Sequence, residues 1–599
     1  MSILETIDNS SDIKQLKTEQ LQALATDIRS QILCTTRKNG GHLSSNLGLV
    51  ETTIALNYVF DFPKDKIIFD VGHQCYAHKL LTGRREQFDS LRQSGGISGF
   101  PDREESQYDV FSTGHAGTSI SAGLGICSAR DKANEDYTVI ALVGDGSLAN
   151  GLNLEALNVS NEKPKNFIVI LNDNGMSISK NKNGFYKFIS KSTTKKGYVN
   201  SKRRFKKIFG NSFITKFFRK IRDFIKRVFN RNNYFEKLGF KYVGVLDGNN
   251  IKEMTKVLSH VKETAKDRAI FLHINTTKGK GYEKAEENSD TYHGVGKNFE
   301  ASSGGFGEKL GNAINDLIEK DDKIVAITAG MKDGTGLAIV EKEHPENFFD
   351  VGIAEEYAIT YASGMAVGGL KPIVAIYSTF LQRAYDQIVH DVCAQNLPVV
   401  MCIDRAGLVG EDGKTHQGVF DLSYLSHLPN LTILTPACEE EMQDALEYAL
   451  SLNSPVAIRY PKKSKLQAQL GGFNKGKWEV LSDGKDLTLL AVGPRMVDLC
   501  KEFEKQTDLK VKTVCVRSVK PLDTSLLDSL EGKVITLEEN LLAGGFGSLV
   551  ATYYQDKGKN VNLHRLGIDD KFIKHGSIQN QLTECGLTVN DIKKLANKF

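Results

Sequence analysis

The sequence predicts an open α/β protein built from three domains with parallel sheets. Two observations lead to this prediction. The chain has 599 residues, which is too long for a single hydrophobic core. Short apolar runs of strand type alternate with helix-length segments along the whole chain. A Gly/Ser stretch at 301–307 and a Lys/Gly-rich stretch at 462–477 interrupt the alternation, so we expect domains at 1–300, 301–472 and 473–599.

In the first domain, continuous apolar runs predict buried strands at 138–143 and 167–171, with a helix at 152–159 between them. Asp145 follows the first strand, and Asn174 follows the second, 29 residues later. Open α/β sheets bind ligands at these carboxyl ends. A carboxylate and an amide oxygen suit Mg²⁺, and the glycines beside Asp145 allow a diphosphate to approach closely. An ordinary Gly-Asp-Gly turn is the alternative interpretation.

Three histidines upstream lie in Gly/Ser-rich loops: His42, His73 and His115. Imidazole can donate hydrogen bonds to phosphate or transfer protons near neutral pH. The three loops therefore indicate polar groups converging on a phosphate-bearing ligand, although a lone histidine is more often structural. Downstream, a Gly/Lys stretch carries Lys278 and Tyr282, and His293 follows.

The second domain is expected to contain strands at 323–329, 348–353, 372–378 and 398–403. Glu355 comes directly after the second of these strands. A carboxyl group there is a candidate for a raised pKa, whereas the common alternative is a glutamate that favours the helix dipole. A polar segment with Tyr377, Phe380 and Arg383 follows the third strand.

Two arginines in this domain indicate a phosphate clamp, because guanidinium binds phosphate bidentately. Arg383 is expected in the first turn of a helix, where a cation opposes the dipole, and Arg459 at a strand end. Either could instead form a surface ion pair. The Gly-rich loop 404–418 contains Asp412 and His416. Strands of the third domain are expected at 487–492, 512–516 and 534–537.

Composition indicates an ordinary soluble protein, with 40% hydrophobic and 25% charged residues. No apolar run is long enough to span a membrane. The acidic N-terminal residues show no signal-peptide pattern, and the nine cysteines contain no CxxC pair, which favours the cytoplasm. Residues 187–231 contain 16 lysines and arginines against one acid, Asp223, and carry +15, while the rest of the chain carries −11. This distribution argues against a nucleic-acid protein.

The basic segment forms most of an insertion expected at about 181–233. Its apolar residues recur at helical spacing, which predicts an amphipathic basic helix: Phe217, Ile221, Phe224, Ile225 and Val228. One interpretation is a cover near the active-site mouth with solvated cations. The alternative is reversible docking on an anionic membrane surface, without stable membrane association. We expect excision of 201–231 to leave a folded, cofactor-competent dimer.

Five motifs occur in one order along the chain: GGHLSSNLG, DVGHQ, GDG followed by LNDN, YSTFLQRAYDQ and DGKTHQG. Together with Glu538-Glu-Asn540 and Gly544-Gly-Phe-Gly547, they resemble the 1-deoxy-D-xylulose-5-phosphate synthase family of transketolase-like enzymes. The resemblance runs almost from end to end. The chain departs from the family pattern at three places: Glu356-Tyr357 replaces Gln-His, Gly175 stands where an acid is usual, and Lys462-Lys463 replaces Arg-Gly.

The resemblance implies thiamine diphosphate and Mg²⁺ as cofactors, held by three transketolase-type domains (diphosphate-binding, pyrimidine-binding and C-terminal). It implies that the metal is bound by Asp145, Asn174 and the carbonyl of Met176. It implies that the cofactor is lined by His73, Gly114, His115, Ala116, Gly146, Ser147, Asn174, Lys278 and Tyr282, with Glu355 on the aminopyrimidine and Phe380 stacked on its ring. The cofactor would act as electron sink after decarboxylation.

The implied reaction joins pyruvate to D-glyceraldehyde 3-phosphate with loss of CO₂, the first step of the non-mevalonate isoprenoid route, which also feeds thiamine and pyridoxal synthesis. The acceptor phosphate would be bound by Tyr377, Arg383 and Arg459. Proton transfer and carboxylate orientation would fall to His42, Asp412, His416 and His293, whose order stays open. The resemblance also implies a homodimer.

Two rival activities share the cofactor. A classical transketolase would consume a ketose phosphate, and the decarboxylating component of a 2-oxoacid dehydrogenase would need a lipoyl partner. A different class of protein, a thiamine-diphosphate-binding regulator without turnover, is disfavoured because Glu355, Asp145 and Asn174 are intact.

Overall fold

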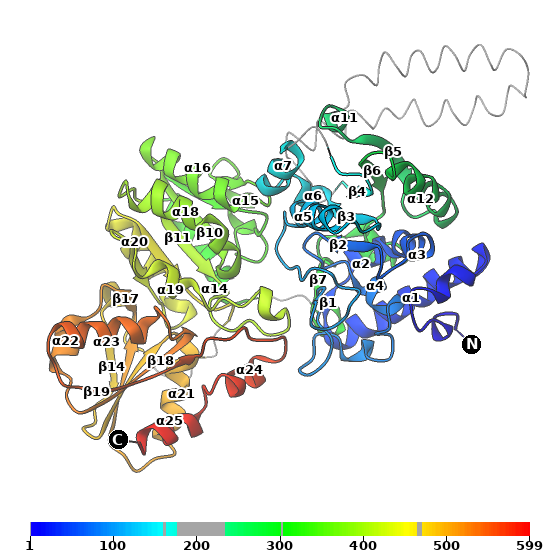
Figure 1. The fold of residues 1–599 in the computed structure, drawn as a ribbon. Helices are drawn as coiled ribbons and strands as arrows, with labels where there is room; N and C mark the ends of the chain where they lie inside the picture. The colour runs from blue at the N-terminus through cyan, green and yellow to red at the C-terminus, as the bar shows by residue number, and fades with distance from the viewer. Residues whose placement is uncertain are drawn as a thin grey trace, which may run out of the picture. The chain divides into compact units, whose positions relative to one another are not determined.

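The computed structural model describes residues 2–159, 163–175, 234–300, 304–463, 466 and 470–598. Met176 and the basic insertion expected at 181–233 lie outside these residues. The chain forms two compact units, one of residues 1–91 and 99–301, the other of residues 92–98 and 302–599. Each unit is described by itself below (Figure 1).

The first unit contains a five-stranded sheet in which every neighbouring pair is parallel. In spatial order its strands are β2 (Lys66–Phe69), β3 (Val139–Gly144), β4 (Phe167–Asp173), β6 (Ile270–Asn275) and β5 (Lys241–Asp247). A short antiparallel pair joins β1 (Gly41–His42) to β7 (Gly294–Val295).

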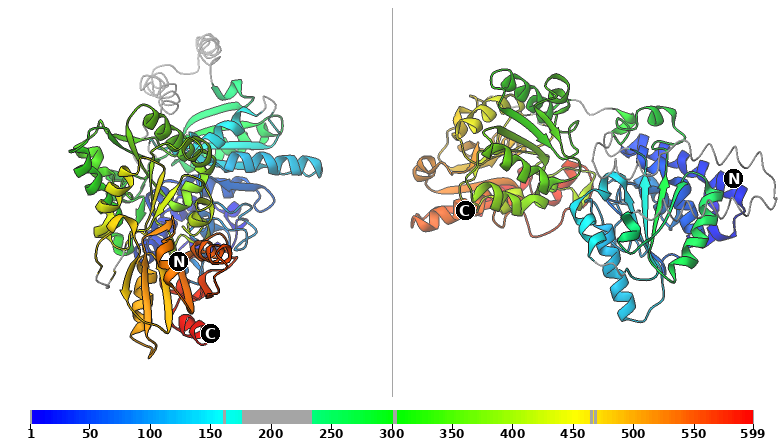
Figure 2. Two further views of the ribbon diagram at one scale, coloured as in Figure 1. Left: turned by 90° about the vertical axis from the view of Figure 1, so that its left-hand side faces the viewer. Right: turned by 90° about the horizontal axis from the view of Figure 1, so that it is seen from above.

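Side chains alternate across β3, and both of its faces are buried. Val139, Ala141 and Val143 enter a core with Phe167 and Ile120, while the intervening residues of the strand are also fully buried. A strand covered on both faces must be apolar throughout, which explains the continuous run in the sequence. The right-hand view of Figure 2 shows helices on both sides of this sheet.

The helices of the first unit connect and cover these strands. They are α1 (Thr18–Asn39), α2 (Ser44–Gly48), α3 (Val50–Val59), α4 (Tyr76–Leu81), α5 (Ser119–Lys132), α6 (Asp145–Leu148), α7 (Gly151–Asn158), α11 (Tyr234–Lys237), α12 (Ile251–Ala265) and α13 (Glu283–Glu287).

The second unit contains two sheets. The seven-stranded sheet runs β17 (Ser518–Lys520), β12 (Thr432–Leu434), β13 (Val456–Arg459), β11 (Val400–Asp404), β10 (Lys371–Tyr377), β8 (Ile324–Thr328) and β9 (Phe348–Asp350). All of its pairs are parallel except the edge pair of β12 with β17. Its helices are α14 (Phe306–Ile318), α15 (Ala338–Glu343), α16 (Glu355–Val367), α17 (Ser378–Leu381), α18 (Tyr385–Gln387), α19 (Asp421–Leu425) and α20 (Met442–Ser451).

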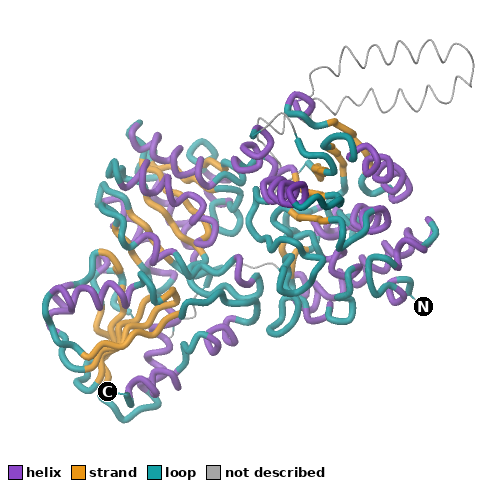
Figure 3. The backbone as a smooth tube through the Cα atoms, in the orientation of Figure 1, coloured by secondary structure: helices purple, strands orange, loops and turns teal. Residues whose placement is uncertain are grey.

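The five-stranded C-terminal sheet runs β14 (Glu479–Ser482), β16 (Val511–Val516), β15 (Leu487–Val492), β18 (Lys533–Leu541) and β19 (Asn562–Ile568), and only β14 is antiparallel. Leu487 and Leu489 pack toward α21 (Pro494–Glu504), whereas Leu490 packs on the face that holds α23 (Phe546–Asp556). The remaining helices are α22 (Thr524–Ser529), α24 (Ile578–Glu584) and α25 (Val589–Ala596). Figure 3 shows this layering of strands between helices.

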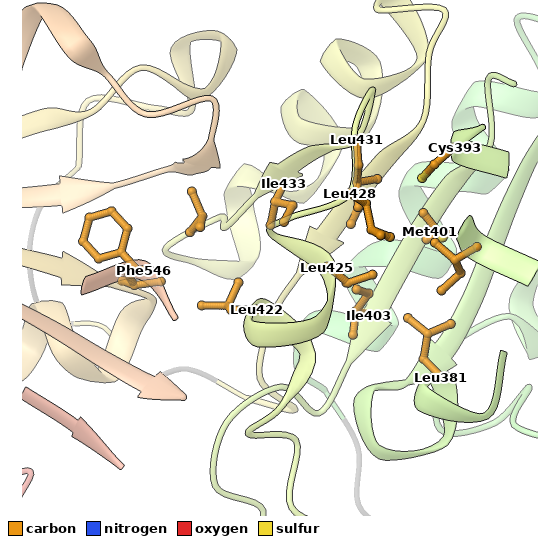
Figure 4. Packing of buried hydrophobic residues seen from close by; sticks show 14 of the residues in the cluster. Leu381, Cys393, Met401, Ile403, Leu422, Leu425, Leu428, Leu431, Ile433 and Phe546 are labelled. Atoms are coloured by element: carbon orange, nitrogen blue, oxygen red, sulfur yellow. The ribbon is translucent and has the colours of Figure 1, made fainter. Parts of the chain in front are cut away.

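One continuous core joins the two sheets of the second unit. Phe546 of α23 lies beside Leu422 of α19, and the cluster continues through Ile433 to Ile403 and Leu381 (Figure 4). In addition, β17 leaves the C-terminal part of the chain to extend the seven-stranded sheet. The two sheets are therefore packed into one body.

The predicted α/β class with parallel sheets is confirmed, and strands occur where the apolar runs indicated. The sequence did not indicate that residues 92–98 pack with the second unit, 200 residues before the rest of it begins near 302. Among the described residues, no helix is both long and apolar enough to cross a membrane.

Candidate active site

Asp145 and Asn174 lie at the carboxyl ends of adjacent strands, as the spacing predicted. β3 and β4 are parallel neighbours, with Gly144 opposite Asn172. Asp145 begins α6, whose first turn also contains Gly146 and Ser147, and the Gly146 N–H donates to Asp145 Oδ1 at 2.9 Å. The predicted metal residues thus follow two strands that are hydrogen-bonded to each other.

Asp145 is buried in surroundings that call for a cation. Burial, together with the nearby Asp173 charge, raises the pKa of Asp145 to about 7. Its Oδ2 atom is buried and has no hydrogen-bond partner within the described part of the chain. A bound divalent cation would offset the cost of burying the ionised Asp145 carboxylate, so the residues present fit Mg²⁺. No group of three His, Cys, Asp or Glu side chains forms a metal site in the described ranges, so further ligands would be amide, carbonyl or phosphate oxygens.

Two more strand ends contribute to the same edge of the sheet. Asp70 follows β2 and accepts backbone N–H groups of Gly117 and Ser119, at 2.8 and 3.0 Å, which shapes the turn that carries Gly114, His115 and Ala116. Lys278 follows β6 and is almost fully buried, with Nζ 3.8 Å from Asp290. Tyr282, farther along, packs against Tyr292.

Three of the predicted histidines are brought together in the first unit. The ring of His42 lies 5.4 Å from that of His73 and 5.8 Å from that of His293, and the last two are 5.2 Å apart. Pairing of β1 with β7 sets His42 opposite Gly294 and so produces this approach. Desolvation and the neighbouring cation Lys278 lower the pKa of His293 well below 6.5. His293 is therefore neutral at pH 7 and can accept or donate a proton.

A buried chain of hydrogen bonds behind the metal residues was not predicted. His273 Nε2 lies 2.9 Å from Asp173 Oδ2, and Tyr242 Oη lies 2.8 Å from His273 Nδ1. His273 is fully buried on β6, and Tyr242 is on the neighbouring strand β5. The sequence signal was only a histidine inside an apolar strand, which alone does not identify a partner.

Glu355 is the first residue of α16 and is 3% exposed. Burial raises the pKa of this carboxyl to about 7, although the positive charge of Arg383 opposes the rise. Glu355 Oε2 is buried without a hydrogen-bond partner among the described residues. An unsatisfied carboxyl oxygen with a proton-binding range near neutrality fits a nitrogen of an aminopyrimidine ring.

Aromatic and cationic groups follow strands β10 and β11 of the same unit. Phe380 stacks on Tyr377 with ring centres 5.9 Å apart, and His416 meets Phe380 edge-on at 5.6 Å. Arg405, at φ 57°, lies 3.7 Å over the Tyr377 ring and donates to Asp404 at 2.6 Å. Arg405 was not predicted as a site residue, because a single arginine after a strand does not indicate a binding role until its contacts in the fold are known.

Lys462 is a second cation that the sequence interpretation passed over. Desolvation, with the nearby charge of Arg405, lowers the pKa of Lys462, although its side chain reaches solvent. Two neighbouring cations of this kind suit a bound anion. Lys462 occupies one of the positions that depart from the family pattern.

Arg459, which was predicted to bind phosphate, contacts protein groups on both sides of its guanidinium. Arg459 is 6% exposed, and its Nε donates to Asp421 at 2.8 Å while Nη2 donates to the carbonyl of Glu539 at 2.9 Å. These bonds tie β13 to α19 and β18. Arg383 lies in a 3-10 turn, Gln382–Ala384, where its charge acts on Glu355.

Asp412 and His416, both predicted, share a neighbour from the first hundred residues. Arg92 forms an ion pair with Asp412. Desolvation lowers the pKa of His416, and the positive charge of Arg92 contributes to the same effect. Arg92 was missed because 320 residues separate it from Asp412.

Comparison with known proteins gives these features a context. Residues 4–276 match the family described as 1-deoxy-D-xylulose-5-phosphate synthase, residues 306–466 the pyrimidine-binding domain of transketolase, and residues 476–592 the transketolase C-terminal domain. The fold and the site thus define a transketolase-type, thiamine-diphosphate-dependent transferase. A 1-deoxy-D-xylulose-5-phosphate synthase of Clostridium tetani is 45% identical, with all of both chains covered. One of Carboxydothermus hydrogenoformans is 47% identical, with 100% of this chain and 98% of that protein covered.

The chain belongs to the 1-deoxy-D-xylulose-5-phosphate synthase family. Among solved structures, transketolase from Campylobacter jejuni is 19% identical and covers 98% of this chain and 100% of its own, with a TM-score of 0.42.

Proposed function

We propose that the protein condenses pyruvate with D-glyceraldehyde 3-phosphate, releasing CO₂ and forming 1-deoxy-D-xylulose 5-phosphate. The full-length similarity to relatives of that name carries the proposal. Thiamine diphosphate, when bound, supplies the electron sink that decarboxylation of pyruvate requires. The roles of the chain's own residues follow from their surroundings.

Glu355 holds the aminopyrimidine end of the cofactor and moves its proton. The unsatisfied Oε2 would share a proton with ring nitrogen N1′ of the bound cofactor. A pKa of about 7 lets the carboxyl group take up and release that proton at neutral pH. Phe380 packs against the pyrimidine ring, and its stacking on Tyr377 fixes its orientation.

Mg²⁺ and the diphosphate belong to the carboxyl edge of the first unit's sheet. Asp145 supplies the charged ligand and Asn174 an amide oxygen, whereas Met176, whose carbonyl was also expected here, lies outside the described residues. Gly146 and Ser147 lie in the first turn of α6, where backbone N–H groups can bind the diphosphate, and Lys278 supplies a positive charge. His73, the turn 114–116 and Tyr282 line the rest of this part.

The acceptor phosphate is bound by Arg405, Lys462 and Tyr377. Arg405 lies flat on the Tyr377 ring, which holds its guanidinium in one orientation. The positive charge of Arg383 acts on Glu355, where it opposes the rise in the pKa of that carboxyl group. Arg459 is left out of this proposal because its side chain already pairs with Asp421.

Neutral imidazoles provide the proton-transfer groups. His293 and His416 both have lowered pKa values, so each is uncharged at pH 7 and can exchange a proton with the substrates. His42 contacts the ring of His293, and Asp412 contributes a carboxylate beside His416.

We also propose a cytoplasmic homodimer. Helix α16, which begins with Glu355, exposes 54% of Tyr357 and 70% of Val367. Apolar groups in this position favour contact with a second copy. Analytical ultracentrifugation of the intact protein measures the mass directly.

The reaction is tested by incubating the protein, thiamine diphosphate and Mg²⁺ with pyruvate and D-glyceraldehyde 3-phosphate. We expect CO₂ release and a pentulose phosphate identified by mass. Turnover of a ketose phosphate in place of pyruvate would indicate a classical transketolase. A requirement for a lipoyl acceptor would indicate a dehydrogenase component, and cofactor binding without CO₂ release would indicate a regulator.

A further inference from the structure

The Gly-rich loop that carries Asp412 and His416 is held in place by the C-terminal part of the chain. The loop, residues 404–418, is closed by reciprocal backbone hydrogen bonds between Gly407 and Gly418, at 2.6 and 2.9 Å. Three of its glycines, Gly407, Gly410 and Gly413, adopt positive φ values of 84°, 93° and 72°.

Each of these three glycines lies close to a residue of the C-terminal part of the chain. A Cβ on Gly407 would lie 3.1 Å from Glu539, one on Gly410 would lie 3.4 Å from the Gly576 carbonyl, and one on Gly413 would lie 3.0 Å from His575. Positive φ and close approach together explain why glycine stands at every third position here. The loop is shaped against the C-terminal surface.

Polar contacts fix the loop backbone at two points. Gln581 is 1% exposed, and its amide both accepts from Gly410 N at 3.1 Å and donates to the Gly410 carbonyl at 2.8 Å. The Arg495–Glu539 ion pair holds the backbone of Leu408 in the same manner. Arg495 Nη2 donates to the Leu408 carbonyl at 3.1 Å, and Glu539 Oε1 accepts from the Leu408 N–H at 3.4 Å.

The same C-terminal segment holds the stretch that carries Arg92. His575 Nε2 donates to the Gly96 carbonyl at 3.0 Å, and Asn580 Nδ2 donates to Ser94 Oγ at 2.8 Å. Residues 574–581 therefore contact both segments that carry the Arg92–Asp412 ion pair, at Ser94 and Gly96 on one side and at Gly410 on the other. These contacts lie within the second unit.

We infer that residues 574–581 form a positioning element for the active site. They hold loop 404–418 and residues 92–98 against each other, so that Arg92 reaches Asp412 beside His416. The C-terminal part of the chain thereby takes part in substrate turnover without contacting substrate. The inference rests on the proposed function where turnover is concerned, but the positioning of the loop can be measured without it.

The first test replaces Gln581 with methionine, which keeps the side-chain length and removes both hydrogen bonds to Gly410 together with the one to the Lys574 carbonyl. We expect amide hydrogen exchange at 408–416 in the holoenzyme to rise about tenfold, and kcat/KM for pyruvate to fall by about the same factor. Asp523→Ala is the matched control, because Asp523 caps α22 in the same part of the chain and is remote from the loop. It should lower the melting temperature and leave the loop exchange and the kinetics unchanged.

A double-mutant cycle distinguishes positioning from general destabilisation. If Gln581 acts through the ion pair, then Gln581→Met should cost little further activity in an Asp412→Asn background. Additive losses, or unchanged exchange at 408–416, would overturn the inference. As a second variant, His575→Ala should reduce kcat/KM, and His575→Gln, which keeps a donor for Gly96, should restore it. A wild-type protein inactive with pyruvate would refute the proposed function and leave the exchange test standing.

Discussion

His273 Nε2 and Asp173 Oδ2 lie 2.9 Å apart in the interior of the first unit, directly behind the turn that carries Asn174. Tyr242 continues the chain of hydrogen bonds to the neighbouring strand. Partners of this kind orient a metal-binding segment although they do not touch the metal. The arrangement couples three strands to the cation site proposed at Asp145 and Asn174.

His273→Phe should therefore weaken Mg²⁺ binding by about 10- to 100-fold, the usual effect of losing an outer partner. Calorimetric titration of Mg²⁺ in the presence of thiamine diphosphate measures this affinity without turnover. Tyr242→Phe is the control, because it keeps the His273–Asp173 pair and should have a smaller effect. An unchanged affinity in His273→Phe, with circular dichroism showing a folded protein, would contradict the coupling.

The buried carboxyl of Glu355 predicts a pH-dependent stability of the cofactor-free protein. Its pKa is about 7 in the folded state, against 4.5 as the ordinary value. Below pH 4.5 both states are protonated and there is no penalty. As the pH rises toward 7 the unfolded chain loses this proton first, so stability falls, and above 7 the full penalty, on the order of 3 kcal/mol, is present.

Glu355→Gln should consequently raise the melting temperature of the cofactor-free protein at pH 8 and leave it nearly unchanged at pH 4.5. Calorimetry of both proteins at the two pH values measures the difference. Glu356→Gln removes the same charge from the neighbouring, half-buried position and should show no such pH dependence. A stabilisation by Glu355→Gln that is equal at both pH values would rule out the raised pKa.

Arg405→Gln and Lys462→Met should mainly weaken binding of the phosphorylated acceptor. Each loses a charge-assisted contact of about 1.5–3 kcal/mol, which corresponds to roughly 10- to 150-fold in KM for D-glyceraldehyde 3-phosphate. An unphosphorylated aldehyde is the discriminating substrate. If these variants lose as much with that aldehyde, then the two cations do not bind the phosphate.

Arg459→Met should instead reduce stability, because it leaves Asp421 buried and without its ion-pair partner. The loss is expected to be about 3–5 kcal/mol, as for other broken buried pairs. Chemical denaturation followed by circular dichroism measures it. A stable Arg459→Met protein with a selectively raised KM for the phosphorylated acceptor would return Arg459 to the phosphate site.

The sequence was sufficient for features that depend on local pattern. Strands such as β3 and β15 are apolar on both faces, so their runs were visible without knowledge of the fold. Asp145 and Asn174 could be assigned to adjacent strand ends, because the strand–helix–strand order implies a parallel pair. The order of the motifs along the chain, taken as a family resemblance, indicated the cofactor and the reaction.

Features that depend on long-range contacts could not be predicted. Arg459 was assigned to phosphate from its place at a strand end, and its ion pair with Asp421, 38 residues away, leaves no local pattern in the sequence. Arg92 and Gln581 belong to segments almost 490 residues apart that meet at one loop, as Asn580 and Ser94 show with a separation of 486. His273 appeared as one polar residue in an apolar strand. Met176 and the basic segment 187–231 lie outside the described residues, so their predicted roles remain predictions.

Glu355 is proposed to start the decarboxylating condensation of pyruvate with D-glyceraldehyde 3-phosphate. This role is tested most directly by following [2-¹³C]pyruvate by NMR with wild-type protein and Glu355→Ala, each saturated with thiamine diphosphate and Mg²⁺. We expect the wild type to place the label at C2 of 1-deoxy-D-xylulose 5-phosphate and the folded variant to form it at least about 100-fold more slowly. A variant that keeps more than about a tenth of the wild-type rate would show that Glu355 is not the acid–base group, because losing such a group costs about 10²- to 10⁴-fold.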